Sequence, residues 1–249
     1  MASFSHRLGN RLYECCYPLY RPIYSAFKAV TDRAERRLLR RCVMEGMVVA
    51  DAGANIGIYS EFLSSLVGPS GRVHSFEPSP ENFSRLQRSV RRRSNIVCNP
   101  MAVGAKSGEI LLHLSDTMNV DHRTYASPEE NRRSITVRCI ALDDYFPVCA
   151  RVNLIKADIQ GFELAALMGA ERVLAENPNI KLLLEFWPYG LKTSGADPRA
   201  LLEFLAVRNF SVAKVERDGA LCVLTDDDFG LGETRFNFAY SPAPVMAAQ

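Results

Sequence analysis

The stretch Val48-Val49-Ala50-Asp51-Ala52-Gly53-Ala54-Asn55-Ile56-Gly57 decides the fold of this chain. It begins in a short apolar strand, Met47–Ala50, and ends where apolar residues start to recur at helical spacing. The loop between strand and helix carries four residues of interest, Asp51, Gly53, Asn55 and Gly57. Glycines in such a loop let the backbone pass close to a ligand and enter the helix tightly. The stretch therefore predicts an α/β fold that binds a ligand at this loop.

Outward from this unit, apolar strands alternate with segments of helical periodicity, such as the helix expected over Phe162–Ala175. This alternation predicts a Rossmann-like α/β domain with a mostly parallel, seven-stranded sheet, helices on both faces and a terminal antiparallel hairpin. We expect the domain to cover residues 46–241, with an insertion at about 115–134. A helical extension is expected over residues 1–45 and a frayed tail over residues 242–249.

A second acid, Glu77, follows the next predicted strand, Arg72–Phe76. A carboxylate at that place suits hydrogen bonds to the hydroxyls of a ribose. Dinucleotide-binding folds share this plan, so the loop glycines alone do not identify the ligand.

Two features of the loop favour S-adenosylmethionine over a dinucleotide. The glycine spacing from Gly53 to Gly57 is G-x-x-x-G, which departs from the G-x-G-x-x-G of dinucleotide sites. Asp51, at the mouth of the loop, would repel a pyrophosphate at the helix N-terminus. S-adenosylmethionine has no phosphate, and its ammonium and sulfonium both favour a nearby carboxylate.

Composition sets the broad class. Of the 249 residues 47% are hydrophobic and 23% charged, which is ordinary for a globular protein. The net charge of +2 is too small to indicate nucleic acid as the main partner. Seven cysteines without a CxxC pair, and no secretory signal, favour reduced thiols and a cytoplasmic location. No stretch is apolar enough for a transmembrane helix, although peripheral membrane contact through the N-terminal helices stays open.

Four segments together resemble the FkbM-type methyltransferases. They are residues 51–57, residues 75–82 (SFEPSPEN), residues 142–145 (LDDY) and residues 155–163 (IKADIQGFE). The resemblance covers roughly residues 48–186. It implies a class I methyltransferase fold, S-adenosylmethionine as methyl donor, and O-methylation of a hydroxyl on a sugar, a glycan or a related small natural product.

The resemblance also implies roles for individual residues. Asp51, Gly53, Asn55 and Gly57 match the family's donor-binding loop, and Glu77 matches the acid that binds the ribose. Met101 and Ala102, after the third strand, match the loop beside the adenine. Asp158 matches the acid that faces the methyl group. Ala52 departs from the family, which more often has a β-branched residue there.

Three residues are candidates for catalysis, because a hydroxyl acceptor must lose a proton during transfer. Asp158 ends the predicted central strand at the ligand edge of the sheet, and it could equally cap the next helix. His122 lies in the polar insertion and is suited to accept a proton near neutral pH. Glu185 ends the fifth strand at the same sheet edge. Glu163 is expected to cap a helix, and no metal site is expected because the histidines do not pair at ligand spacing.

Three other readings stay open. An RNA or protein methyltransferase is disfavoured because amine methylation commonly uses an Asn- or Asp-Pro-Pro-aromatic segment where this chain has Asp158-Ile159-Gln160-Gly161. An NAD-linked oxidoreductase is disfavoured by Asp51 and the glycine spacing. A non-catalytic, donor-binding scaffold would leave Asp158 and Glu185 unexplained. The oligomeric state and the acceptor are not predicted.

Overall fold

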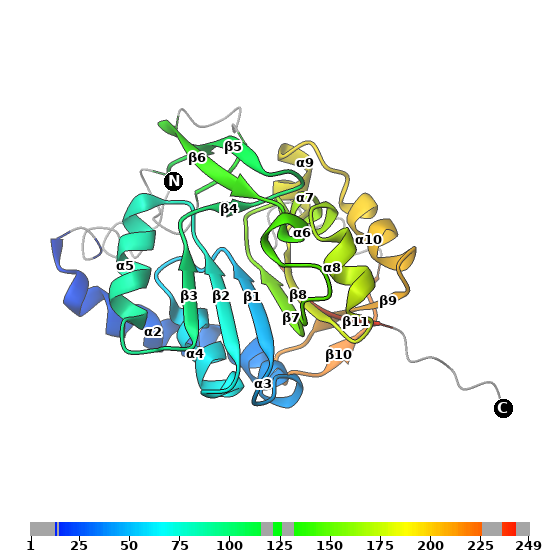
Figure 1. The fold of residues 1–249 in the computed structure, drawn as a ribbon, viewed down its shortest axis with the longest axis horizontal. Coiled ribbons are helices and arrows are strands. Elements are labelled where there is room, and N and C mark those ends of the chain that lie inside the picture. Colours follow the sequence, from blue (N-terminus) through cyan, green and yellow to red (C-terminus); the bar gives the residue numbers. More distant parts are fainter. Residues whose placement is uncertain (1–12, 14, 116–121, 126–131, 226–235, 243–249) are drawn as a thin grey trace.

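The computed structural model describes residues 13, 15–115, 122–125, 132–225 and 236–242, the last of these by backbone alone. Its centre is an eight-stranded sheet in the order β10-β9-β11-β8-β7-β1-β2-β3 (Figure 1). The strands are β1 (Val48–Ala52), β2 (Arg72–Phe76), β3 (Ile96–Asn99), β7 (Leu154–Ala157), β8 (Lys181–Phe186), β9 (Phe210–Val215), β10 (Leu221–Cys222) and β11 (Phe236–Pro242).

Five neighbouring strands, from β3 through β2, β1 and β7 to β8, pair in parallel. The strand β11 then inserts antiparallel between β8 and β9, and β9 forms an antiparallel hairpin with β10. The mostly parallel sheet and the terminal hairpin are confirmed. The sheet has eight strands where seven are expected, because the two residues of β10 add a short edge.

Helices cover both faces of the sheet. One face packs against α7 (Glu163–Met168), α8 (Glu171–Glu176) and α10 (Pro198–Ala206), and the other against α3 (Arg33–Cys42) and α4 (Ile58–Val67). A further helix, α5 (Pro80–Val90), packs beside β3. Burial follows the alternation of each strand: Val49, Leu154 and Leu183 face α3 and α4, while Ala50, Ile155 and Leu184 face the other layer.

A small second sheet lies above the carboxyl ends of the parallel strands (Figure 1). Its order is β4-β6-β5, formed by Ala102–Val103, Ser134–Ile140 and Gly108–His113. It begins directly after β3 and brackets the expected insertion, of which residues 115, 122–125 and 132–134 are described. The expected frayed tail lies outside the described residues from 243 onward.

The described part of the N-terminal region is helical. The helix α2 (Tyr17–Thr31) is followed after one residue by α3. The guanidinium of Arg21 fastens α2 to the domain by bonds to Ser89 (2.8 Å) and Glu61 (2.6 Å). The rings of Tyr20 and Tyr24 stack at 5.3 Å and pack toward Ile56 and Ile58 in the loop and helix after β1.

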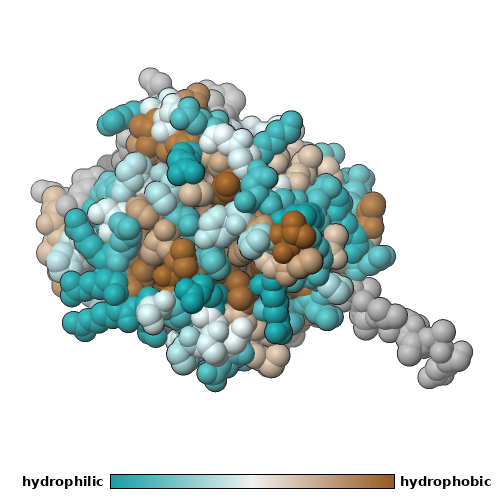
Figure 2. Space-filling view, in the orientation of Figure 1, coloured by the Kyte–Doolittle hydropathy of each residue, from teal (hydrophilic) through white to brown (hydrophobic). Residues whose placement is uncertain are grey.

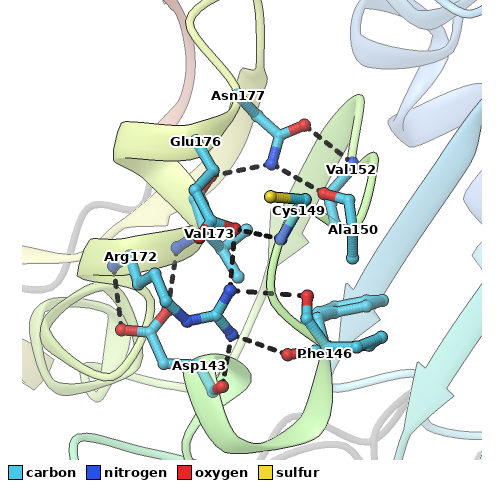
Figure 3. Close-up of polar contacts among 10 residues, drawn as sticks. Asp143, Phe146, Cys149, Ala150, Val152, Arg172, Val173, Glu176 and Asn177 are labelled. Atoms are coloured by element: carbon cyan, nitrogen blue, oxygen red, sulfur yellow. Dashed lines mark hydrogen bonds and ion pairs between the residues drawn. The ribbon is translucent and has the colours of Figure 1, made fainter.

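The LDDY motif has a structural role at the base of α8 (Figure 3). It forms the short helix α6 (Leu142–Tyr145), and the Asp143 carboxylate accepts bonds of 2.9 Å from the backbone N–H groups of Arg172 and Val173. The Arg172 guanidinium in turn donates to the carbonyls of Asp143 and Phe146. These contacts satisfy the free N–H groups at the start of α8 and hold the segment that leads into β7.

The surface seen in Figure 2 is mainly hydrophilic, and its apolar side chains form small separate groups. Among the described residues, no helix has both the length and the apolarity that crossing a bilayer requires.

Candidate functional site

The loop after β1 packs tightly against the end of β7. A Cβ added to Gly53, which has φ +77°, would lie 2.0 Å from the carbonyl oxygen of Asp158. Asn55 and Gly57 also have positive φ, and Gly57 is the N-cap of α4. The backbone N–H groups of Gly53 and Ala54 both donate to the carbonyl of Phe76 at the end of β2. Only a residue without a side chain fits at Gly53, which keeps backbone exposed between two strand ends.

Glu77 ties this loop to the next one. Its Oε2 accepts a bond of 2.8 Å from the backbone N–H of Asn55, and its Oε1 accepts one of 2.8 Å from Ser79. The side chain is buried, and burial raises the pKa of the carboxyl to about 7. Glu77, the acid expected to bind the ribose, is thus joined to the backbone of the loop after β1 by a hydrogen bond.

Asp51 makes contacts that the sequence alone did not predict. It is fully buried, accepts a bond of 2.7 Å from Ser60 Oγ, and lies 3.1 Å from Lys156 Nζ. Asp51 and Lys156 are direct partners in the β1–β7 register, so the sheet itself brings them together. Burial opposes the charged form of Lys156, but Asp51 and Asp158 outweigh it and the pKa of the ammonium is raised.

Gln160 joins two of the expected catalytic acids. Its Nε2 donates to Asp158 Oδ1 at 3.0 Å and to Glu185 Oε2 at 2.8 Å. Its Oε1 is buried and, within the described residues, has no hydrogen-bond partner. Sequence reasoning did not select Gln160. Its signal in the sequence is its place in the segment 155–163, two residues after Asp158. In the structure it lies in a turn with a positive φ of 59°.

Glu163 holds the backbone of the same turn. It is fully buried, and its Oε1 accepts bonds from the N–H groups of Ile159 (3.0 Å) and Gly161 (3.3 Å). Burial raises the pKa of its carboxyl to about 7. These contacts are structural, in line with the expected capping role.

Two cavities share a wall formed by Gly53, Asn55, Asp158 and Gln160. Their volumes are about 60 Å³ and about 260 Å³, so the second cavity is the roomier of the two. The first cavity is lined by Glu77, Ala102, Val103, His122, Thr124 and Phe162, among others. The second is lined by Tyr24, Lys28, Tyr59, Lys156 and Glu185, among others.

The three catalytic candidates are thus divided between the cavities. Asp158 lies in the shared wall and Glu185 in the second cavity, whereas His122 lines the first. The Nδ1 atom of His122 accepts a bond of 3.1 Å from the backbone N–H of Ser115. Asp51, Gly57 and the buried Met101 are not among the residues that line either cavity.

The residues present fit S-adenosylmethionine on three counts. Gly53 lines both cavities at a point where no Cβ fits, Gln160 offers a buried acceptor without a partner among the described residues, and Glu77 lines the first cavity with a carboxyl group. Carboxylates and a buried amide oxygen match a cationic ligand better than a pyrophosphate. Across the described residues, no group of three His, Cys, Asp or Glu side chains is arranged to hold a metal ion.

Comparisons with known proteins agree with this geometry. Residues 51–212 match the model of the methyltransferase FkbM domain. The chain is 27% identical over 188 residues to the hexuronic acid methyltransferase AglP of Haloferax volcanii, covering 73% of this chain and 72% of that protein.

Solved structures show the same fold. An rRNA methylase from Streptococcus thermophilus matches with a TM-score of 0.50 and 13% identity, over 84% of this chain and 95% of that one. A Streptococcus mutans protein solved in complex with SAH matches with a TM-score of 0.50 and 11% identity, over 84% and 96%. At these identities the likeness is one of fold.

Proposed function

Since this chain belongs to the FkbM methyltransferase family and is an S-adenosylmethionine-dependent methyltransferase, we propose that it methylates a hydroxyl of a sugar, a glycan or a related small natural product. The observation that carries the proposal is the pair of carboxylates, Asp158 and Glu185, which one amide group of Gln160 holds at the second cavity. Carboxylates accept hydrogen bonds from sugar hydroxyls and can take up a proton from one of them. The relative that acts on a hexuronic acid supports a sugar-like acceptor.

The bound donor would supply a methyl carbon already activated by a sulfonium. The chain's own residues then have two tasks, to hold the acceptor oxygen in line and to accept its proton. Positioning alone can contribute about 7–11 kcal/mol to lowering the barrier. Asp158 or Glu185 is the proposed base, and Gln160 fixes the orientation of both.

On the donor side, Gly53, Asn55 and Gly57 shape the loop, and Glu77 is proposed to accept from the ribose hydroxyls. Ala102 lines the same cavity as Glu77, with Met101 buried beside it, and both stay proposed for the adenine side. Asp51 is proposed to act on the donor through Lys156, because its own carboxylate is engaged by Lys156 and Ser60.

His122 is proposed to bind ligand rather than to act as the base. With Nδ1 accepting from Ser115, the neutral ring carries its proton on Nε2. In that form Nε2 donates a hydrogen bond and does not accept a proton. The side chain also lies with Glu77 in the first cavity, away from Glu185.

The first test is calorimetric titration of the purified protein with S-adenosylhomocysteine and, separately, with NAD. Transfer of a labelled methyl group from S-adenosylmethionine to a panel of methyl hexosides and hexuronic acids then identifies the acceptor. Binding of S-adenosylhomocysteine alone, with turnover of a member of the panel, is the expected result. Binding of NAD, or turnover only on RNA or protein, would overturn the proposal.

The base is tested with Glu185→Gln and Asp158→Asn, which keep the shape of each side chain. We expect one of these two variants to lower turnover about 100- to 10,000-fold, because it lacks the proposed base. In Glu185→Gln the Kd for S-adenosylhomocysteine should change little. His122→Gln is the matched comparison and should retain a turnover well above that of the more affected variant. Full turnover in both carboxylate variants would contradict the proposed proton transfer.

A further inference from the structure

The two cavities differ in the charges of their linings. The lining of the first includes Glu77, Asp158 and His122, and none of its lining residues is a lysine or an arginine. The lining of the second includes two cations, Lys28 and Lys156, beside Asp158 and Glu185. S-adenosylmethionine has a similar asymmetry, since its adenosine end is neutral and its amino-acid end carries an ammonium and a carboxylate. A carboxylate is stabilised where cationic donors can reach it.

The wall between the cavities suits the ammonium of that end. Gln160 Oε1 is a buried acceptor without a partner among the described residues, and Gln160 lines both cavities. Asp158, in the same wall, adds negative charge. With the ribose at Glu77 in the first cavity, the amino-acid end has to extend past this wall into the second cavity.

Lys28 is the better placed of the two cations for the carboxylate. Lys156 is only 4% exposed and is engaged with Asp51, at 3.1 Å. The side chain of Lys28 is 24% exposed; its Nζ lies 2.6 Å from Asp32 Oδ2 and 5.8 Å from the centre of the Tyr59 ring. An ammonium has three donors, so the pair with Asp32 leaves donors for a ligand.

Lys28 belongs to α2, which lies before the segment that matches the family model. Tyr24, one helical turn earlier, lines the same cavity. The anchoring of α2 through Arg21 to Glu61 and Ser89 holds this face against the cavity. A region outside the matched domain thus completes one wall of the site.

We propose that Lys28 binds the carboxylate of the donor, so that α2 is part of the donor site; this rests on the donor assigned under the proposed function. The donor's amino-acid end is then held between Lys28 of α2 and Gln160 of the β7–α7 turn. Contact with the acceptor is left to Asp158, Glu185 and the remaining walls of the second cavity.

The test compares two ligands that differ in the amino-acid end. S-adenosylhomocysteine carries it, and 5′-methylthioadenosine lacks it. We expect Lys28→Met to weaken binding of S-adenosylhomocysteine about tenfold or more and to change binding of 5′-methylthioadenosine less than about twofold, because a charge-assisted bond is lost only in the first case. Lys28→Arg should retain most of the affinity. Lys106→Met, at an exposed lysine of the small-sheet region, is the matched control.

Removal of Lys28 leaves Asp32 without its cation, so thermal unfolding of each variant is measured first. The double variant Lys28→Met with Asp32→Asn repeats the comparison without an unpaired carboxylate. Equal losses for the two ligands, or no loss for either in a folded variant, would overturn the inference. Failure of the wild type to bind either ligand would instead overturn the proposed function.

Discussion

Lys156 and Asp51 form a buried ion pair whose members come from neighbouring parallel strands. Lys156 is 4% exposed and Asp51 is not exposed at all, so both charged groups are almost wholly removed from bulk solvent. The Nζ of Lys156 also lies 4.9 Å from the centre of the Tyr59 ring, a favourable position for a cation. The stability of each charge therefore depends on the other.

We predict that Lys156→Met lowers the free energy of unfolding by about 3–5 kcal/mol, because it leaves the Asp51 carboxylate buried without its cation. The double variant Lys156→Met with Asp51→Asn should recover most of that loss. Urea unfolding at about pH 7.5 measures the free energy of unfolding of both variants. Lys192→Met, at an exposed lysine, should change stability by no more than about 0.5 kcal/mol. If Lys156→Met behaves like Lys192→Met, the pair does not stabilise the fold.

At the scale of elements, the turn from Asp158 to Glu163 connects β7 to α7 and contributes Asp158 and Gln160 to the wall that the two cavities share. Gly161 has φ +97°, and a Cβ there would lie 2.4 Å from the backbone of Gly190 in α9 (Pro188–Thr193). Glu163 closes the turn by accepting from two of its N–H groups. The orientation of Gln160, and through it of Asp158 and Glu185, follows from this packing.

Glu163 predicts a pH dependence of stability. The pKa of its carboxyl rises from 4.5 to about 7 on folding because of burial, so the folded state binds more protons than the unfolded state between these values. Stability associated with this group is present below pH 4.5 and is lost as the pH rises to about 7, by on the order of 3 kcal/mol.

Glu163→Gln mimics the protonated side chain and keeps an acceptor for Ile159 and Gly161. Relative to the wild type, the variant should gain stability at about pH 8 and gain little or none at about pH 3.5, because these values lie about one unit outside the range from 4.5 to about 7 at either end. Urea unfolding at the two values gives the difference. Subtracting the wild type at each pH removes the parallel contribution of Glu77, whose pKa is also raised to about 7. The same difference at both values would contradict the assigned titration.

The prediction of a single helix over Phe162–Ala175 is wrong, because the periodicity of apolar residues does not show where a helix is interrupted. The structure has two short helices there, α7 and α8, separated at Gly169–Ala170. A Cβ at Gly169 would lie 2.1 Å from the carbonyl oxygen of Gly104, which follows β4 in the segment that leads to β5. The break therefore depends on a contact with a segment 65 positions earlier (169 − 104), which local pattern cannot reveal.

For the whole molecule, the sequence predicts those features well that depend on local patterns of apolar residues and glycines. The strand–loop–helix unit at Asp51–Gly57 and the alternation that follows it are sufficient for the parallel sheet and its ligand edge. The contacts of Asp51, the role of Gln160 and the part of α2 in the second cavity depend on residues far apart in sequence. The sequence places Asp158 and Glu185 at the same edge of the sheet, but which charged groups pair with each other depends on the register.

The attachment of α2 to the domain should couple the N-terminal helix to donor binding. Arg21 bonds to Glu61 on α4 and to Ser89 on α5, so it connects α2 with both helices that follow the two donor loops. If Lys28 holds the donor carboxylate, a loosened α2 weakens that contact without changing the adenosine side. Binding would in turn hold α2 in place, since coupling between two sites is reciprocal.

We therefore predict that Arg21→Met weakens S-adenosylhomocysteine binding several-fold, about 1 kcal/mol or less, and leaves 5′-methylthioadenosine binding unchanged. Amide hydrogen exchange across Tyr17–Thr31 should be faster in the free variant than in the free wild type. In the wild type, S-adenosylhomocysteine should slow exchange there and 5′-methylthioadenosine should not. Arg88→Met, at an exposed arginine of α5, is the control. Faster exchange in Arg21→Met with unchanged affinity for both ligands would mean that the attachment of α2 does not affect donor binding. Equal protection of α2 by both ligands would mean that α2 responds to the adenosine part of the ligand.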